Sequence, residues 1–415
     1  MSFQQGLSGL NAASKTLEAI GNNVANSGTV GFKSSQAQFA DIFANSLQGS
    51  AGGTTQVGIG VKVSQVAQAF TQGNITSSNS PLDLAINGGG FFRMSTNGTI
   101  AYGRNGQFQL DKNGFVTNAN GAHLTGYTAD ANGVLSTGAP GDLKISSADI
   151  APKITTTVNA LLNLDSNKPA IDSTATPFNM SDPSTYTNAT SVSVFDSLGV
   201  SHVLQTFYVK TGPNPGVPAN GTWDVYGAAD DVALTPSKLG TLTFGSDGTI
   251  VSGSPLSASI PIDSGAATPL TVAVDYAGTT QYGSAFSVNS LKQDGFTSGR
   301  LSGFAVSADG TVVGRYTNGK STTLGQVVLA NFANVNGLQP LGNNVWGETS
   351  ASGPALVSTP NSGSLGVLQS SAVEDSNVDL TAELVNMITA QRVYQANAQT
   401  IKTQDQVLQT LVNLR

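Results

Sequence analysis

The chain has 415 residues, enough for two or three domains, and only 10% of them are charged, far below the roughly 25% of an ordinary soluble domain. A net charge of −7 without clustered Lys and Arg argues against a surface for nucleic acid or anionic membranes, and the lack of cysteine excludes disulfides, thiolate metal sites and cysteine nucleophiles. The sequence shows no cleaved secretion signal and no apolar run of membrane-span length. We therefore expect no membrane insertion, and a protein that is cytoplasmic or exported by a route without such a signal.

The N-terminal stretch predicts an amphipathic helix that ends between Asn26 and Gly31, where Asn, Ser and Gly accumulate. Its large apolar residues recur with alternating spacings of four and three, and Ser14 and Gly21 complete the row. This spacing keeps one stripe of a helix against a partner. The large residues of the stripe are Phe3, Leu7, Leu10, Leu17 and Val24.

The stretch from Ser376 to Arg415 predicts a second, longer helix with the same spacing. Asp379 is the expected N-cap, and Glu383 lies in the first turn, where a negative charge suits the helix dipole. The seam consists of Leu380, Leu384, Met387, Tyr394, Ala398, Ile401, Leu408 and Val412, interrupted by Gln391 and Asp405. We expect the two terminal helices to pair; whether the pair only braces one chain or also binds other copies stays open at this point.

The region between the helices predicts short β-strands joined by tight turns. The alternating run from Val57 to Val63 predicts a strand or hairpin, and a Ser-Leu-Gly turn before His202 predicts another hairpin. The triplet at residues 88–90 lacks the Lys-Ser or Lys-Thr of a phosphate loop, so we interpret it as a turn. Asn-Gly pairs recur about every eight residues, as hairpins require: Asn87-Gly88, Asn97-Gly98, Asn105-Gly106, Asn113-Gly114 and Asn120-Gly121.

Residues that could perform chemistry are scattered. The two histidines, His123 and His202, have no second metal ligand nearby in the sequence, and no zinc-protease, nucleophile-elbow or Walker motif is present. Most aspartates lie in turns, which favour Asp for its bond to the backbone. We predict no catalytic residue, cofactor site or metal site and expect no enzyme; a carboxylate pair assembled in space, as in glycosidases, remains the alternative.

Four parts of the sequence resemble the bacterial flagellar rod and hook proteins. Residues Asn22 to Lys33, followed by Phe39 and Phe43, resemble the N-terminal signature of that family, and we expect the rings of Phe32, Phe39 and Phe43 to be buried against the following segment. Residues 82–92 and 104–127 resemble its first β-domain, and residues 291–366 resemble the returning half of the same domain. Residues 377–397 resemble the closing signature of its C-terminal helix.

The resemblance implies a mainly β fold with α-helical termini, in which one β-domain is built from two chain halves and holds a second, inserted β-domain. The N- and C-terminal helices are expected to pair. The implied domains are a helical assembly domain at 1–74 and 371–415, a first β-domain at 75–150 and 291–370, and an outer β-domain at 151–290.

Within the family the inserted domain favours a hook subunit, because rod subunits are usually shorter. The resemblance implies export through the flagellar secretion apparatus and self-assembly into a curved tube that joins rod to filament. Its partners would be other copies, the rod, the hook cap, the hook–filament junction proteins and the export apparatus. The expected assembly interface comprises both helical stripes together with Asn26 and Phe32. A distal-rod subunit and a secreted β-rich adhesin are the alternatives, although an adhesin gives no reason for paired terminal heptads.

Overall fold

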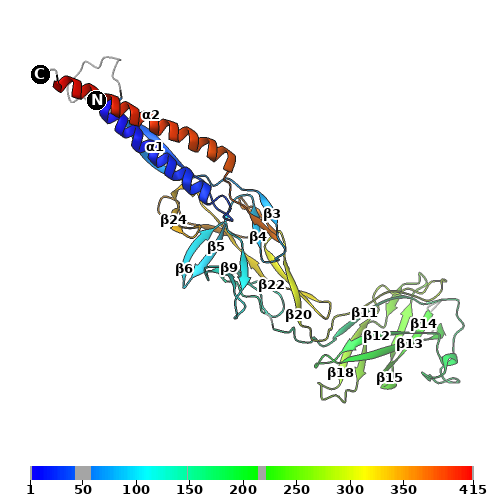
Figure 1. The fold of residues 1–415 in the computed structure, drawn as a ribbon. Helices are drawn as coiled ribbons and strands as arrows, with labels where there is room; N and C mark the ends of the chain where they lie inside the picture. The colour runs from blue at the N-terminus through cyan, green and yellow to red at the C-terminus, as the bar shows by residue number, and fades with distance from the viewer. Residues whose placement is uncertain (1, 43–57, 147, 214–220, 414–415) are drawn as a thin grey trace. The chain divides into compact units, whose positions relative to one another are not determined.

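The computed structural model confirms a mainly β chain with one long helix at each end (Figure 1). The two helices, α1 (Ser2–Ala25) and α2 (Leu380–Asn413), lie side by side. Neither they nor any other helix in the described residues combines the length and apolar character needed to cross a membrane. The structure describes residues 2–42, 58–146, 148–213 and 221–413.

A helical module forms at the ends of the chain. Helix α2 begins at the predicted N-cap, since the Asp379 Oδ1 atom accepts hydrogen bonds from the backbone N–H groups of Thr381 and Ala382 at 2.9 and 3.1 Å. Strands β1 (Ser35–Ile42) and β2 (Gly60–Gln68) form an antiparallel pair that packs on α1. The predicted strand near residues 57–63 is thus part of β2, and Val57 lies outside the described residues.

The first compact unit comprises residues 1–147, 303–315 and 321–415, and its β-domain draws strands from both halves of the chain. Strand β9 pairs with both β5 and β22, while β23 also pairs with β5, so the halves share one sheet. Asn97 and Gly98 have φ angles of 50° and 86°, which suit the two-residue turn joining β5 to β6. Besides β1 and β2, the strands are β3 (Ile75–Ser77), β4 (Leu84–Asn87), β5 (Phe91–Thr96), β6 (Thr99–Gly103), β7 (Phe108–Leu110), β8 (Val116–Asn118), β9 (His123–Thr128), β10 (Gly141–Asp142), β20 (Leu301–Val306), β21 (Thr311–Tyr316), β22 (Ser321–Val327), β23 (Leu329–Asn331), β24 (Gln339–Gly342), β25 (Val345–Gly347), β26 (Leu356–Ser358), β27 (Val367–Ser370) and β28 (Ala372–Glu374).

An aromatic cluster connects the helical module to this β-domain. Phe91 and Trp346 are almost fully buried, and Phe70, from the segment that follows β2, meets both rings edge to face at centroid distances of 5.5 and 5.4 Å. The Trp346 indole N–H also donates to the Gln68 Oε1 atom at 2.6 Å. The end of the β1–β2 hairpin is therefore anchored on the β-domain core.

The second compact unit comprises residues 148–302 and 316–320 and contains two sheets. Their buried side chains, among them Trp223, Tyr208 and Leu270, form one shared core. In β17 buried Leu256, Ala258 and Ile260 alternate with exposed serines, as the period of a strand requires. The sheets contain β12 (Asn188–Phe195), β13 (Ser201–Pro213), β14 (Gly221–Ala229), β15 (Val232–Phe244) and β16 (Ile250–Ser252), and β17 (Leu256–Ile260), β18 (Leu270–Asp275), β11 (Thr157–Asn163) and β19 (Ser287–Gln293).

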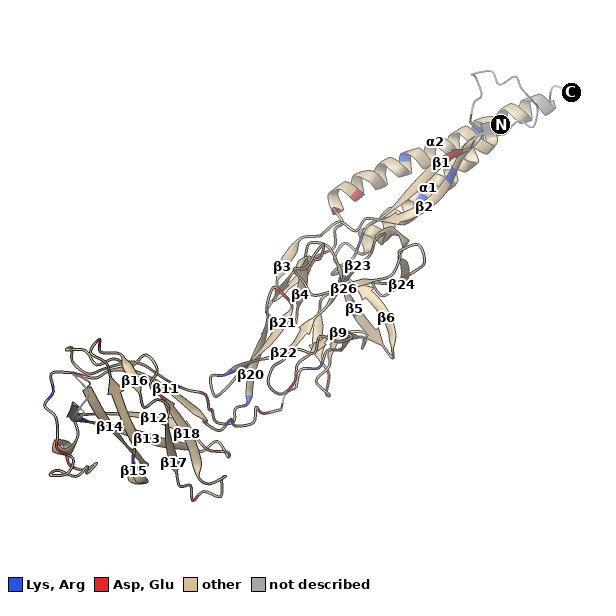
Figure 2. Cartoon of the chain, turned by 180° about the vertical axis from the view of Figure 1, so that it is seen from behind, with Lys and Arg blue, Asp and Glu red and all other residues tan. Residues whose placement is uncertain are grey.

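Charged residues are sparse throughout (Figure 2), and a few of them are buried. One is Asp196, at the turn between β12 and β13, whose side chain is fully inaccessible. Its Oδ1 atom accepts hydrogen bonds from the N–H groups of Leu198 and Val200 at 2.9 and 2.8 Å, and its Oδ2 atom accepts one from the Ser264 hydroxyl at 3.0 Å. Burial alone would raise the pKa of Asp196, but these hydrogen bonds outweigh it and hold the pKa below its usual value.

We predict that Asp196→Asn destabilises the second unit by about 1 to 3 kcal/mol at pH 7, since hydrogen bonds to a charged acceptor are lost. Because the folded-state pKa lies below the unfolded value of about 3.9, this stabilisation is present above that value and disappears as the pH falls through the folded-state pKa. Urea unfolding followed by Trp223 fluorescence in a Trp346→Phe background measures the difference. A deficit that stays constant between pH 7 and pH 2 would contradict this account.

Candidate functional site

The two terminal helices contact each other through small residues. The α1 stripe that faces α2 includes Gly6 and Gly9, and Ala13 and Ile20 on the same stripe are buried. A Cβ atom at Gly9 would lie 2.7 Å from the Asn397 Oδ1 atom, and one at Gly6 would lie 3.0 Å from the Ile401 Cγ1 atom. The glycines therefore allow the two helix backbones to come close together.

The contact stripe of α1 differs from the predicted one. Pairing of the helices is confirmed, but Phe3 and Leu7 remain 47% and 44% exposed, and Leu10, Leu17 and Val24 are only half-buried. The predicted stripe lies one position around the helix from Gly6, Ala13 and Ile20. The spacing in the sequence identifies the stripe with large apolar residues. The stripe that contacts α2 in the structure instead contains small residues, which let the two helix backbones come close together.

In helix α2, too, most large apolar residues of the predicted seam are not buried against the other helix. Of its predicted seam, Met387 and Ile401 are half-buried, while Leu380, Leu384, Tyr394 and Leu408 are exposed. Val412 belongs to α2, but its side chain lies outside the described part of the chain. We call the exposed apolar residues of α2 together the α2 apolar face, although they lie on several sides of the helix; they are Leu380, Leu384, Val385, Ile388, Val393, Tyr394, Val407 and Leu408.

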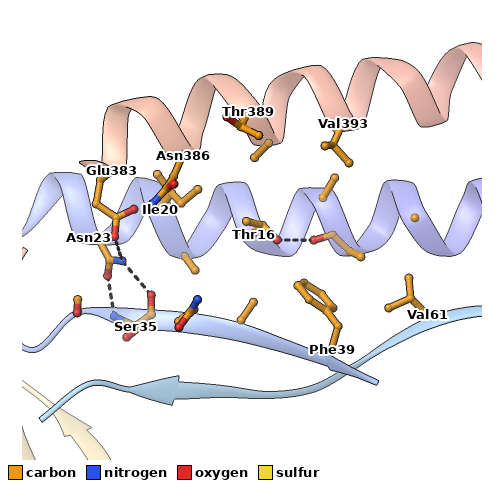
Figure 3. Close-up of a pocket in the computed structure, with 18 of the residues that line it drawn as sticks. Thr16, Ile20, Asn23, Ser35, Phe39, Val61, Glu383, Asn386, Thr389 and Val393 are labelled. Carbon is orange, nitrogen blue, oxygen red and sulfur yellow. Dashed lines mark hydrogen bonds between the residues drawn. The ribbon is translucent and has the colours of Figure 1, made fainter. Parts of the chain in front are cut away.

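A groove of about 780 Å³ lies where α1, α2 and the β1–β2 hairpin meet (Figure 3). Its walls are mostly small or apolar, with Ala12 and Thr16 from α1 and Val393 from α2. Phe39, from β1, projects into it and stays 39% exposed, so the expectation that this ring is buried is wrong. The hairpin leaves room between itself and α2 that no side chain of the described part fills. Phe43, also expected to be buried, lies outside the described residues.

Asparagine side chains fix the register of the helical module. The buried Asn23 amide donates to the Glu383 Oε1 atom and to the Ser35 carbonyl, both at 2.9 Å, and its Oδ1 atom accepts from the Ser35 N–H at 2.8 Å (Figure 3). Asn377 accepts from the Ser34 N–H at 2.7 Å and donates to the Ala69 carbonyl at 2.7 Å. Each residue thus joins the hairpin to one end of a helix, and a buried polar contact such as that of Asn23 specifies register.

The other two predicted interface residues lie between α1 and β1. The Asn26 side chain donates to the Asn22 carbonyl at 3.0 Å and accepts from the Thr29 hydroxyl at 3.2 Å, so it stabilises the end of its own helix. Phe32 is half-buried, and its carbonyl accepts from the Asn377 N–H. Sequence reasoning missed Asn23, because α1 contains many polar residues and nothing in the sequence distinguishes Asn23 from the neighbouring Asn22.

The histidines lie in strands β9 and β13, and each is paired with at least one carboxylate. His123 Nδ1 is 2.8 Å from Asp142 Oδ2, and the His123 ring stacks on Phe115. His202 Nδ1 is 2.7 Å from Asp230 Oδ2, while its Nε2 atom lies 3.5 Å from Asp196 Oδ2 on the other side of the ring. Across the described ranges no group of three or more His, Asp or Glu side chains is arranged to hold a metal ion.

Four family models match successive segments of the chain. They are "Flagella basal body rod protein" at residues 3–33, "Flagellar hook protein FlgE/F/G D1 domain" at 85–160, "Flagellar basal body protein FlaE D2 domain" at 163–296 and "Flagellar basal body rod FlgEFG protein C-terminal" at 369–414. The first and last match the helical termini, and the D2 model matches most of the second unit.

Full-length relatives decide the family. The chain is 44% identical over 421 residues to the flagellar hook protein FlgE of Escherichia coli, with both chains covered completely. It is 32% identical over 446 residues to FlgE of Borreliella burgdorferi, covering 100% of this chain and 99% of the relative. The chain belongs to the flagellar hook protein FlgE family.

A solved structure shares the fold of this FlgE-family chain. The crystal structure of Helicobacter pylori flagellar hook protein FlgE2 superposes with a TM-score of 0.54 at 12% identity. The match covers 71% of this chain and 99% of that chain. At this identity the similarity supports the fold alone.

We predict that Gly9→Leu separates the terminal helices of this FlgE-family chain, since even a Cβ atom at this position meets the Asn397 side chain. Gly21→Leu is the matched control, because Gly21 lies on the same helix with nothing within 4 Å of its Cβ position. Both changes raise intrinsic helix propensity by up to about 1 kcal/mol. Hydrogen exchange across residues 383–403 should accelerate in the Gly9 variant and not in the Gly21 variant; equal exchange in both would show that close approach is unimportant.

Proposed function

We propose that the chain is a structural subunit of the bacterial flagellar hook, which polymerises into a curved tube and transmits torque from rod to filament. Membership of the FlgE family supports this role, and the α2 apolar face is the observation that supports self-assembly. Its leucines at positions 380, 384 and 408 are 46%, 45% and 54% exposed. Side chains of this size are stabilised by burial, and a neighbouring subunit can bury them.

The lengths of the two helices also favour an intermolecular partner. Helix α1 has 24 residues and α2 has 34, about 36 and 51 Å at 1.5 Å per residue. Gly6, near the start of α1, already contacts Ile401, so α2 continues beyond its partner. Leu408 belongs to that continuation. The predicted interface residues Leu380, Leu384, Tyr394 and Leu408 are therefore available for contacts between copies.

In this proposal the terminal helices form the inner wall of the tube and the β-domains form its outer layers. The other partners are the rod, the hook cap, the hook–filament junction proteins and the flagellar export apparatus. A surface with few charges suits contacts that must re-register as the hook rotates, since no fixed ion pairs have to break. We propose no catalytic activity.

A distal-rod subunit is the second candidate, because both terminal matches are to basal body rod models. The D2 match across residues 163–296 and the complete alignment with FlgE relatives favour the hook. Electron microscopy of purified polymer separates the two: a curved, supercoiling tube supports a hook subunit, and a straight rigid rod supports the alternative.

We predict that Leu408→Asp abolishes polymerisation and leaves monomer stability almost unchanged. Leu408 is exposed in the single chain, where such substitutions change stability by about 0.5 kcal/mol or less. In a polymer the change removes on the order of 1.5 to 3 kcal/mol of apolar burial per subunit and buries an unpaired charge. Sedimentation and negative-stain microscopy measure assembly, and calorimetry measures the monomer.

Val134→Asp is the control for this variant, because Val134 is 64% exposed in a loop of the first unit. It should assemble normally. If Leu408→Asp still forms tubes of normal length, or lowers the monomer melting temperature by many degrees, the α2 apolar face is not an assembly interface.

We also predict that the second unit folds independently and is dispensable for forming a tube. The chain enters and leaves this unit through facing segments, where Ile150 pairs with Gly299 and Lys153 with Phe296. Replacing residues 151–290 with a short Gly-Ser bridge should preserve the first unit and its polymerisation, and should alter curvature. Circular dichroism and microscopy test both points; a deletion chain that cannot fold would contradict the proposed domain division of 75–150 and 291–370 around 151–290.

A further inference from the structure

Three buried charged residues meet where the helical module joins the β-domain. Lys33 and Glu374 are completely inaccessible, and Arg104 is 4% exposed. The Lys33 Nζ atom lies 2.6 Å from Glu374 Oε1, and the Arg104 Nη1 atom lies 3.0 Å from Glu374 Oε2. We call these residues the Glu374 cluster. Glu374 is 341 residues from Lys33 and 270 from Arg104 in sequence, so the cluster forms only when both ends of the chain meet the β-domain.

The cluster joins three chain segments at the boundary between the helical module and the β-domain. Lys33 follows α1, and its ammonium group also donates to the Thr71 carbonyl at 2.7 Å in the segment that follows β2. In that segment the Gly73 N–H donates to Glu374 Oε1 at 3.0 Å, and after α1 the Gly31 N–H donates to the Glu374 carbonyl at 2.7 Å. Glu374 itself ends β28, shortly before α2.

On the β-domain side, Arg104 completes the cluster. Its Nη2 atom donates to the Gly88 carbonyl at 2.9 Å, and its guanidinium carbon lies 5.4 Å from the centroid of the Phe91 ring. The Nε atom is buried without a hydrogen-bond partner among the described residues. Phe91 belongs to the aromatic cluster that also holds Phe70, so the charged and aromatic clusters are neighbours.

The charges in the cluster do not balance. Two cations share one carboxylate, and the Phe91 ring offers the second cation only a weak cation–π contact. Burial lowers the pKa of Lys33, although Glu374 acts in the opposite direction. Among the described residues Glu374 is the carboxylate that pairs with both cations, and losing it would leave two positive charges inside the protein without an anionic partner there.

A cluster of this kind is a costly way to gain stability, because apolar side chains of equal volume often serve as well. Its advantage over an apolar contact is that its hydrogen bonds are directional. Each carboxylate oxygen accepts from donors at defined angles, which fixes the relative orientation of the segments that carry them. We propose that Glu374 is the positioning residue that holds the terminal helix pair on the β-domain in one orientation and so prepares the subunit for assembly. The last clause rests on the proposed function; the first does not.

The test compares variants of the full-length chain by hydrogen exchange in the monomer. Glu374→Gln should accelerate exchange at Gly31, Gly73 and Ser34 by at least about tenfold, with strands β5 and β9 and the second unit unchanged. The critical concentration for polymerisation should rise at least about tenfold in parallel. Glu18→Gln is the matched control, because Glu18 forms an exposed ion pair with Lys15.

Two further variants separate charge balance from packing. Lys33→Met removes one cation and should stay within about threefold of the wild type, because Arg104 and Glu374 remain as a neutral pair. The double variant Lys33→Met, Glu374→Gln should exchange more slowly at Gly31 and Gly73 than Glu374→Gln alone, since one buried cation remains in place of two. If the two side chains only fill space, the opposite order of exchange rates is expected, and the double variant should exchange fastest at Gly31 and Gly73.

The proposal is overturned if Glu374→Gln exchanges like the wild type at Gly31 and Gly73, if β5 and β9 accelerate equally with them, or if the double variant is worst. These results come from the monomer. If the wild type fails to polymerise, the proposed function fails, and the exchange data still decide whether Glu374 positions the helices.

Discussion

Close approach of the two terminal helices is the constraint on which the rest of the structure depends. Gly6 and Gly9 let α1 come near to α2, so the contact stripe of α1 contains several small residues. Large apolar side chains are consequently displaced to the outside of the pair, where Phe3, Leu7 and the α2 apolar face remain exposed. The two helices of a single chain pair with each other, but they do not cover these side chains. The helical module of one chain therefore has no closed hydrophobic core of its own.

The junction with the β-domain compensates for this weak helix contact. Because the interface between α1 and α2 buries few large apolar side chains, the orientation of the pair depends on its attachments at Asn23, Asn377, Phe70 and Glu374. Three of these four are polar or charged. The chain has few charged residues, yet three of them are buried together at this junction. Their ion pairs and hydrogen bonds are directional, so they act where the orientation of the helix pair is determined.

Sequence reasoning succeeded where the cause is local. The Asp379 cap, the turn at Asn97-Gly98 and the end of α1 depend on nearby residues, and each follows from propensity and spacing. It failed where two patterns compete, because heptad spacing in α1 identifies the large apolar stripe, while backbone approach selects the adjacent glycine stripe. It could not find the Glu374 cluster at all, since contacts across 341 and 270 residues leave no local period. Phe39 shows a third limit: the exposure of its ring depends on the groove between the hairpin and the helices, which its sequence neighbours do not indicate.

The positions of the exposed surfaces also constrain the kind of assembly. The α2 apolar face and the groove beside Phe39 share Val393 and otherwise consist of different residues of one helical module, so a contact that placed one against the other would join unlike surfaces of successive copies. Such heterologous contacts do not close into dimers; they give rings or open helical polymers, according to the rotation at each step. In the proposed polymer, that rotation would be set by the helical module, and the way the helix pair is held on the β-domain would decide where the β-domains lie around it. A change of orientation at the Glu374 cluster would then repeat at every subunit and shift the outer layers of the whole polymer.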